Sequence, residues 1–368
     1  MYSQNDLDEA VASGAVSADS ANALRAFIDQ QRATPAVDEE QFRLITGFND
    51  IFVSIAAAIL LFAVGFIGQS LGQSLGLIVD VDGPSPLAPL FVAATAWGLA
   101  MFFTAKRRMA LPSILLLLAF VGSLLAFAGF SLVLAFGPDN LENNERAAAL
   151  IGSAAAAIAA GGAWLHWRTF RVPITVAAGG AAVAAIAVGL LASALGDIPA
   201  LKNIILGFIL LLGVGMFLFA MRWDSSDPAR VTRRSDVAFW LHLLAAPMIV
   251  HPIFSLLGLN DGTATIGEGL VVILLYIAMG ITALAIDRRA LLVSALAYVL
   301  YALNELFRQF GAVELNVALT ALVIGSALLL LSAFWHQARA MVVRPLPDTL
   351  KARLPLIDRK VVSPAPAA

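Results

Sequence analysis

Long apolar stretches alternate with short polar ones from residue 51 to residue 335. A helix needs roughly 20 apolar residues to cross a hydrocarbon core of about 30 Å. By that measure the pattern predicts an all-α, polytopic membrane protein with ten spans, at approximately 51–68, 87–105, 111–136, 147–165, 173–195, 203–221, 237–257, 267–286, 290–310 and 313–335. Pro247 and Pro252 lack the backbone N–H that a helix needs, so we expect the seventh span to be bent or broken.

Polar segments flank this apolar region and predict two further parts of the chain. Residues 1–45 predict a cytoplasmic helical hairpin and linker, in which Gly14 ends the first helix and Ser17 caps the second. The hairpin has little core, so we expect it to dock on the membrane domain, residues 46–336, or on a protein partner. Residues 337–368 form a basic, proline-rich cytoplasmic tail, whose positive charges favour an anionic inner leaflet.

The positions of the basic residues predict the orientation of the chain. With ten spans both termini lie on one side, and 20 of the 23 Lys and Arg residues fall on that side. Only Arg146, Lys202 and Arg308 fall on the other. Cytoplasmic loops are enriched in Lys and Arg, so we predict a multi-pass protein of the inner membrane with both termini in the cytoplasm.

Composition narrows the classes of function further. Hydrophobic residues make up 60% of the chain and charged residues 13%, against about 25% charged residues in soluble domains. The sequence has no cysteine, no phosphate-binding loop and no nucleophile elbow. His242 and His251 are nine residues apart, which places them on opposite faces of a helix rather than in a zinc pair. We expect no enzymatic activity, cofactor, metal ion or nucleic-acid partner.

Small residues in the fourth predicted span and two glycine-dense pieces in other spans indicate close helix packing. Ser153, Ala157 and Gly161 recur at every fourth position of the fourth span, which favours close approach of helix backbones in the bundle or at a homodimer face. The pieces "AAGGAA" and "LGVGMF" lie inside other spans, where helix packing explains them better than nucleotide binding does.

Six polar residues of the later spans are candidates for a binding site, because ionisable side chains are costly to bury in lipid. Glu305 and Arg308 are three residues apart and share one helix face, and Asn304 precedes Glu305. At a rise of about 1.5 Å per residue, Glu305 lies about 22 Å from the cytoplasmic end of its span. The other three candidates fall at a similar depth: His251, Glu268 and Glu314.

These residues support three interpretations. Glu305 and Arg308 can neutralise each other at the headgroup boundary, with the long Arg308 side chain reaching the aqueous phase. The same residues can line a pocket for a solute or proton that opens outward. They can also form a buried network that fixes the register of the helices.

The N-terminal pattern "LDEAVASGAVSADSANALRAF" resembles the leading segment of a bacterial family of predicted multi-pass membrane proteins of unknown function. The resemblance covers the hairpin and the general hydropathy of the apolar region after it. It implies a bacterial inner-membrane location and carries no activity or catalytic position.

These patterns support two functions. The first is a scaffold or sensor in the membrane that contacts the lipid bilayer and a protein partner through the hairpin. The alternative is a secondary transporter of a small solute, with the six polar residues near the outer leaflet. Few polar residues lie at the midplane of the predicted spans, where transporter sites usually sit, so we rank transport second.

Overall fold

The computed structural model describes residues 7, 10–32, 48–80, 82–142, 144–228, 230, 232–257, 266–289, 291–292, 296, 300 and 316–355. Within these residues every regular element is a helix. The chain divides into two compact units, Met1–Phe42 with Asp358–Ala368, and Arg43–Ile357.

The first unit contains the segment for which a helical hairpin is predicted. Its second helix is α2 (Ala18–Arg32), and residues 10–12 are also helical. Gly14 adopts the left-handed conformation, with φ 74°, and its N–H donates to the carbonyl of Val11. The hydroxyl of Ser17 accepts a hydrogen bond from the N–H of Ser20 at 3.1 Å. Both predicted signals, the glycine stop and the serine cap, are therefore confirmed.

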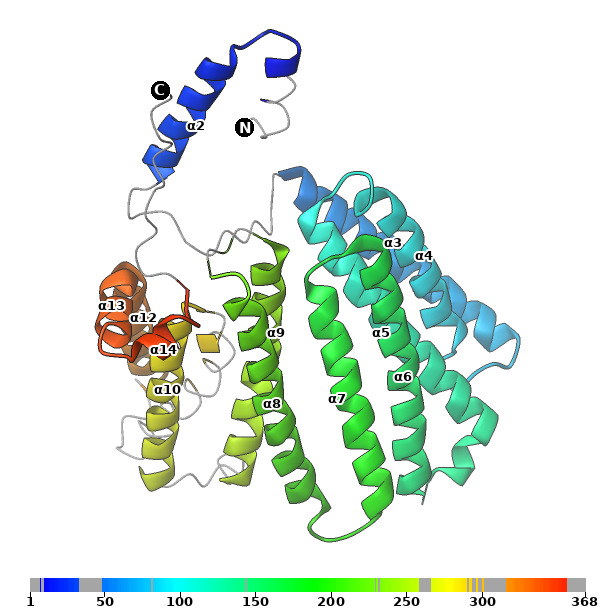
Figure 1. The fold of residues 1–368 in the computed structure, drawn as a ribbon. Helices are drawn as coiled ribbons and strands as arrows, with labels where there is room; N and C mark the ends of the chain where they lie inside the picture. Colours follow the sequence, from blue (N-terminus) through cyan, green and yellow to red (C-terminus); the bar gives the residue numbers. More distant parts are fainter. Residues whose placement is uncertain are drawn as a thin grey trace. The chain divides into compact units, whose positions relative to one another are not determined.

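Seven long helices make up most of the second unit (Figure 1). Consecutive helices pack against each other and are joined by short connections, as expected for antiparallel neighbours in a bundle. The helices are α3 (Phe48–Ser74), α4 (Leu87–Phe103), α5 (Ala110–Phe136), α6 (Glu145–Phe170), α7 (Ile174–Leu195), α8 (Leu201–Ser225) and α9 (Arg233–Leu256), with a short 3-10 turn, η1 (Pro138–Asn140), after α5.

The remaining described helices follow α9 in the chain. They are α10 (Ile266–Ile286), α12 (Asn316–Ala333), α13 (Trp335–Val343) and α14 (Asp348–Lys351). An apolar core joins Ala246, Val250 and Phe254 of α9 to Ala283 of α10 and Trp335 of α13. The C-terminal region of the unit is therefore anchored to α9 and α10.

The number of spans differs from the ten that were predicted. Among the described residues six helices are long and apolar enough to cross a membrane, α3 and α5 to α9, or seven if the bent pair Gly325–Ala333 and Trp335–Val343 is one span. Helix α4 has only 17 residues, about 25 Å of helix, and Leu274–Ile286 is also short. The predicted ninth span, 290–310, lies almost wholly outside the described residues.

Two further expectations about the spans are met only in part. Helix α9 is continuous through Pro247 and Pro252, so the predicted break is wrong, whereas a bend at these residues stays a prediction. In α6, Ser153 is buried, but Ala157 and Gly161 are exposed. Packing of the whole row inside the bundle is therefore wrong for Ala157 and Gly161, and the homodimer face stays a prediction.

The glycine-dense pieces lie at helix contacts, as predicted. A Cβ on Gly180 of α7 would lie 2.9 Å from the methyl carbon of Met216 on α8. A Cβ on Gly213 of α8 would lie 2.8 Å from the carbonyl carbon and oxygen of Met248 on α9. Gly213 lets the backbones of α8 and α9 approach, and Gly180 makes room for the Met216 side chain.

The two ends of the bundle differ in charge. We name the end with connections 104–109, 171–173 and 226–232 the basic end, because Lys106, Arg107, Arg108, Arg171 and Arg230 lie there. We name the other the acidic end, because its connections and helix termini carry Asp80, Asp82, Asp139, Glu142, Glu145 and Asp197.

Four non-glycine residues in the described chain have positive φ: Arg108, Arg171, Arg230 and Asp287.

Candidate functional site

The described residues contain only part of the site that the sequence predicts near the outer leaflet. Four of its residues lie outside them: Asn304, Glu305, Arg308 and Glu314. Glu268 lies in the first turn of α10, and its side chain is not among those that the structure describes. His251 is an exposed residue of α9. The convergence of these six residues stays a prediction.

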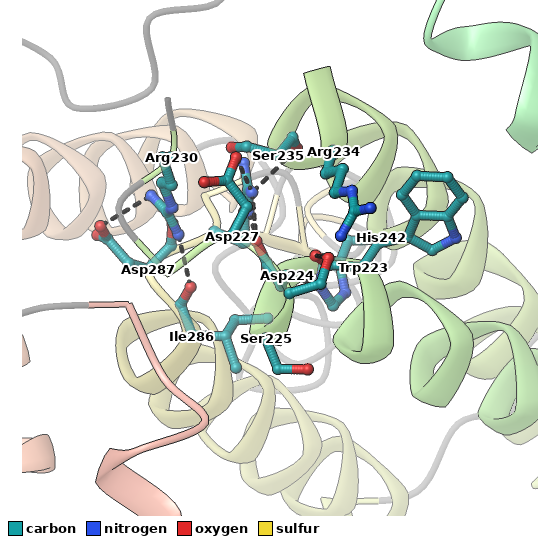
Figure 2. Close-up of polar contacts among 12 residues, drawn as sticks. Trp223, Asp224, Ser225, Asp227, Arg230, Arg234, Ser235, His242, Ile286 and Asp287 are labelled. Atoms are coloured by element: carbon teal, nitrogen blue, oxygen red, sulfur yellow. Dashed lines mark hydrogen bonds and ion pairs between the residues drawn. The ribbon is translucent and has the colours of Figure 1, made fainter. Parts of the chain in front are cut away.

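A buried carboxylate at the C-terminal end of α8 is the centre of a different polar cluster (Figure 2). The two oxygens of Asp224 accept hydrogen bonds from Arg288, from Nη2 at 2.5 Å and from Nε at 3.1 Å. Nε2 of His242 lies 3.2 Å from Oδ2 of the same carboxylate. Nη2 of Arg288 also donates to the carbonyl and hydroxyl oxygens of Ser235, each at 3.0 Å. The cluster joins the end of α8, the start of α9 and the segment after α10.

A second cluster is centred on the neighbouring residue, Asp287. Its Oδ2 accepts a hydrogen bond from Nη1 of Arg230 at 2.9 Å, and its Oδ1 accepts one from Nε1 of Trp335 at 2.7 Å. Nη2 of Arg230 donates to the carbonyls of Ile286 and Asp287, each at 2.8 Å, as Figure 2 shows for Ile286. Nε of Arg339 lies 3.7 Å from Oδ1. This cluster adds α13 and the α8–α9 connection to the first.

The backbone turn at the end of α10 directs the adjacent side chains of Asp287 and Arg288 to different partners. The N–H of Arg288 donates to the carbonyl of Ala283 at 2.9 Å, and the N–H of Asp287 donates to that of Leu284 at 3.3 Å. This is the Schellman pattern, with Asp287 at the left-handed position, φ 55°, that glycine usually occupies. Arg230 is also left-handed, with φ 53°. Such conformations cost energy and persist where surrounding contacts hold them.

The connection between α8 and α9 is closed by a third carboxylate. Oδ2 of Asp227 accepts hydrogen bonds from the backbone N–H of Thr232 at 2.9 Å and from its hydroxyl at 2.7 Å. The Thr232 hydroxyl in turn accepts from the N–H of Arg234 and caps α9. The loop therefore presents Arg230 to α10 in a fixed conformation.

Because both clusters are buried, removal of one of their charged partners is expected to lower the stability of the fold. Asp224, His242 and Arg288 are 1%, 0% and 2% exposed. Removal of one partner from a buried ion pair leaves an uncompensated charge, which costs about 3–5 kcal/mol, although the intact pair adds little net stability. We name the two clusters, together with the Asp227–Thr232 contact, the basic-end network; its members are Asp224, Asp227, Arg230, Thr232, Ser235, His242, Asp287, Arg288, Trp335 and Arg339.

The network lacks the geometry of a catalytic or metal site. The Ser235 hydroxyl accepts from Arg288, and no hydrogen bond joins it to His242 in the described part of the chain. Within that part, no group of three His, Asp or Glu side chains could hold a metal ion. Nδ1 of His242 has no hydrogen-bond partner among the described residues, and Phe217 packs against the ring with centroids 5.2 Å apart. The arrangement holds helix ends together in one register.

A second buried histidine lies in an aromatic setting among α4 to α7. Nδ1 of His166 lies 3.2 Å from the hydroxyl oxygen of Thr175. Its ring centroid lies 4.6 Å from that of Phe170 and 6.2 Å from that of Trp97. These contacts are those of a core residue that fixes α6 against α7.

Sequence reasoning missed the basic-end network because it assigned every basic end of a span to membrane orientation. A signal was present in "DSSDPAR" after α8 and in "IDRR" after α10. Orientation by the positive-inside rule needs Lys and Arg but not acidic residues beside them. The pairing of Asp224 with Arg288, 64 residues apart, requires the tertiary structure.

No family model, curated protein or solved structure matches the chain. The helices themselves define its class, a multi-pass helical membrane protein. The likeness of the N-terminal hairpin to a bacterial family stays a prediction.

Proposed function

We propose that this protein is a scaffold or sensor of the bacterial inner membrane, with both termini in the cytoplasm, and that it is not an enzyme. The basic-end network carries this proposal. Its charged groups are buried against one another and against helix ends, so they brace a fixed surface where the connections of the bundle meet. A transporter needs polar groups along a path through the midplane, whereas this network lies at one end of the bundle.

The N-terminal hairpin supplies the contact with a protein partner in this proposal. Ala21 of α2 is fully buried, whereas Leu24 is 42% exposed. The proposal assigns the exposed Leu24 side chain to the contact with the partner, because it gives this small helix an apolar side chain that its own unit leaves exposed. The basic-end network keeps the cytoplasmic surface of the membrane unit rigid while the hairpin binds.

Photo-cross-linking in membranes tests the proposal. A photoreactive amino acid at Leu24 is expected to form a discrete adduct with a protein, and the same amino acid at the buried Ala21 is the matched control. Deletion of residues 1–40 is expected to remove the partner from purified complexes, whereas Glu305→Gln leaves it in place.

The transporter alternative predicts the opposite outcome. A solute that raises the unfolding temperature of the wild type, but not that of Glu305→Gln, would favour transport. Together with the absence of any adduct specific to Leu24, it would overturn the scaffold proposal.

A further inference from the structure

One surface of α13 combines exposed apolar and basic side chains. The opposite side of the helix is a buried stripe at every fourth residue, Trp335, Arg339 and Val343. At about 100° per residue, the centre of the exposed surface lies about 180° from that stripe. We name this surface the α13 face; its residues are Phe334, Gln337, Met341 and Arg344, all exposed.

The α13 face continues the lipid-facing surface of the preceding helix. Leu329 and Leu330 of α12 are 74% and 60% exposed, as expected for side chains that meet lipid. Phe334 is 55% exposed and Met341 is 72% exposed. The axis turns by 75° between Gly325–Ala333 and Trp335–Val343. With α12 taken as a membrane span, this turn brings α13 close to the membrane plane.

The contacts of the buried stripe fix which way the α13 face points. Nε1 of Trp335 donates to Asp287, and Nη2 of Arg339 donates to the carbonyl of Pro355 at 2.6 Å. The guanidinium of Arg289 lies 4.9 Å above the Trp335 ring. These contacts occupy the side toward α10 and leave the opposite side outward. Because the basic-end network includes Trp335 and Arg339, α13 lies at the basic end.

Basic side chains that follow α13 in the chain match an anionic surface. Arg344 and Arg353 are exposed, and neither forms an ion pair with another described residue. Lys351 is partly exposed and lies 3.4 Å from Asp348. Interfacial helices combine buried apolar side chains with basic ones, and each basic residue near an anionic membrane adds to the attraction.

We propose that the α13 face binds the headgroup region of an anionic bilayer surface, with Phe334 and Met341 inserted and Arg344 and Arg353 facing lipid phosphates. This lipid site does not depend on the scaffold proposal, because its occupant and its test are different.

Fluorescence quenching in vesicles tests this site, and the cysteine-free chain allows a single label. Met341→Cys, carrying an environment-sensitive fluorophore, is reconstituted into vesicles of phosphatidylcholine and phosphatidylglycerol in equal parts. A nitroxide is placed on one lipid or the other. We expect several-fold stronger quenching by the phosphatidylglycerol nitroxide. Leu329→Cys provides the lipid reference, and Asp197→Cys in an acidic-end connection provides the aqueous reference.

Charge removal separates anionic recognition from simple insertion. Arg344→Gln and Arg353→Gln are each expected to lower the preference for phosphatidylglycerol, by up to about fivefold per arginine. Arg146→Gln at the acidic end is the matched control and leaves the preference unchanged. A label at 341 that a water-soluble quencher reaches as readily as the label at 197 would overturn the proposal. So would equal quenching by both lipids in labelled Met341→Cys with Arg344 and Arg353 in place.

Discussion

The carboxylate of Asp224 and the guanidinium of Arg288 form a buried pair whose members depend on each other. Asp224→Asn leaves Arg288 buried without its counter-charge, so we expect the free energy of unfolding to fall by about 3–5 kcal/mol. The double replacement Asp224→Leu with Arg288→Met removes both charges and is expected to restore most of that loss. Equilibrium unfolding in detergent measures both variants.

An exposed ion pair in the same unit provides the control for this experiment. Nζ of Lys351 lies 3.4 Å from Oδ1 of Asp348, and the Asp348 side chain is 97% exposed. Water screens such pairs, so Asp348→Asn is expected to leave stability unchanged. Equal effects of Asp224→Asn and Asp348→Asn would contradict the structural role of the basic-end network.

Gly213 and Gly215 on α8 offer a second comparison between single residues. A Cβ at Gly213 would lie 2.8 Å from backbone atoms of Met248, whereas a Cβ at Gly215 meets nothing within 4 Å. Gly213→Ala must push α8 away from α9, at a cost of about 1–3 kcal/mol. Gly215→Ala is expected to be neutral or stabilising, because alanine favours helix by about 1 kcal/mol over glycine. Thermal unfolding of the two variants distinguishes them, and an equal response would place the α8–α9 contact elsewhere.

At the level of elements, local signals in the sequence predicted the structure where the interaction is also local. Gly14 and Ser17 act on neighbouring backbone groups, so their roles could be predicted from the sequence. The prolines of α9 indicated a bend or a break, but the helix continues through them, and its residues share one apolar core with residues of α8 and α10. The turn between α12 and α13 has neither Gly nor Pro. It depends on contacts of Trp335 and Arg339 with distant residues, which no local pattern contains.

The same distinction applies to the candidate site. Hydropathy identifies charges that interrupt a span, which led to Glu305 and Arg308. The basic-end network instead lies where spans end, and there its charges have the composition of ordinary cytoplasmic loops. Only the packing of α8, α9, α10 and α13 shows that these charges are buried.

For the molecule as a whole, the separation of basic and acidic ends predicts which connections face the cytoplasm. The proposed orientation places residues 104–109 inside and residues 75–86 and 137–144 outside. Because the chain has no cysteine, Asp82→Cys, Arg107→Cys and Glu142→Cys each report one connection. A membrane-impermeant maleimide applied to intact cells is expected to label positions 82 and 142. Position 107 is expected to react only after permeabilisation.

This experiment also decides whether α4 crosses the membrane. Its 17 residues give about 25 Å of helix, less than a hydrocarbon core of about 30 Å. A short span is accommodated by local thinning of the bilayer at a modest cost, and the packing of α4 against α3 and α5 favours that outcome. Positions 82 and 107 then differ in labelling. If both react from the same side, α4 does not cross. Relative to the residues before α4, every connection after it then lies on the opposite side of the membrane from the one that the proposed orientation gives it.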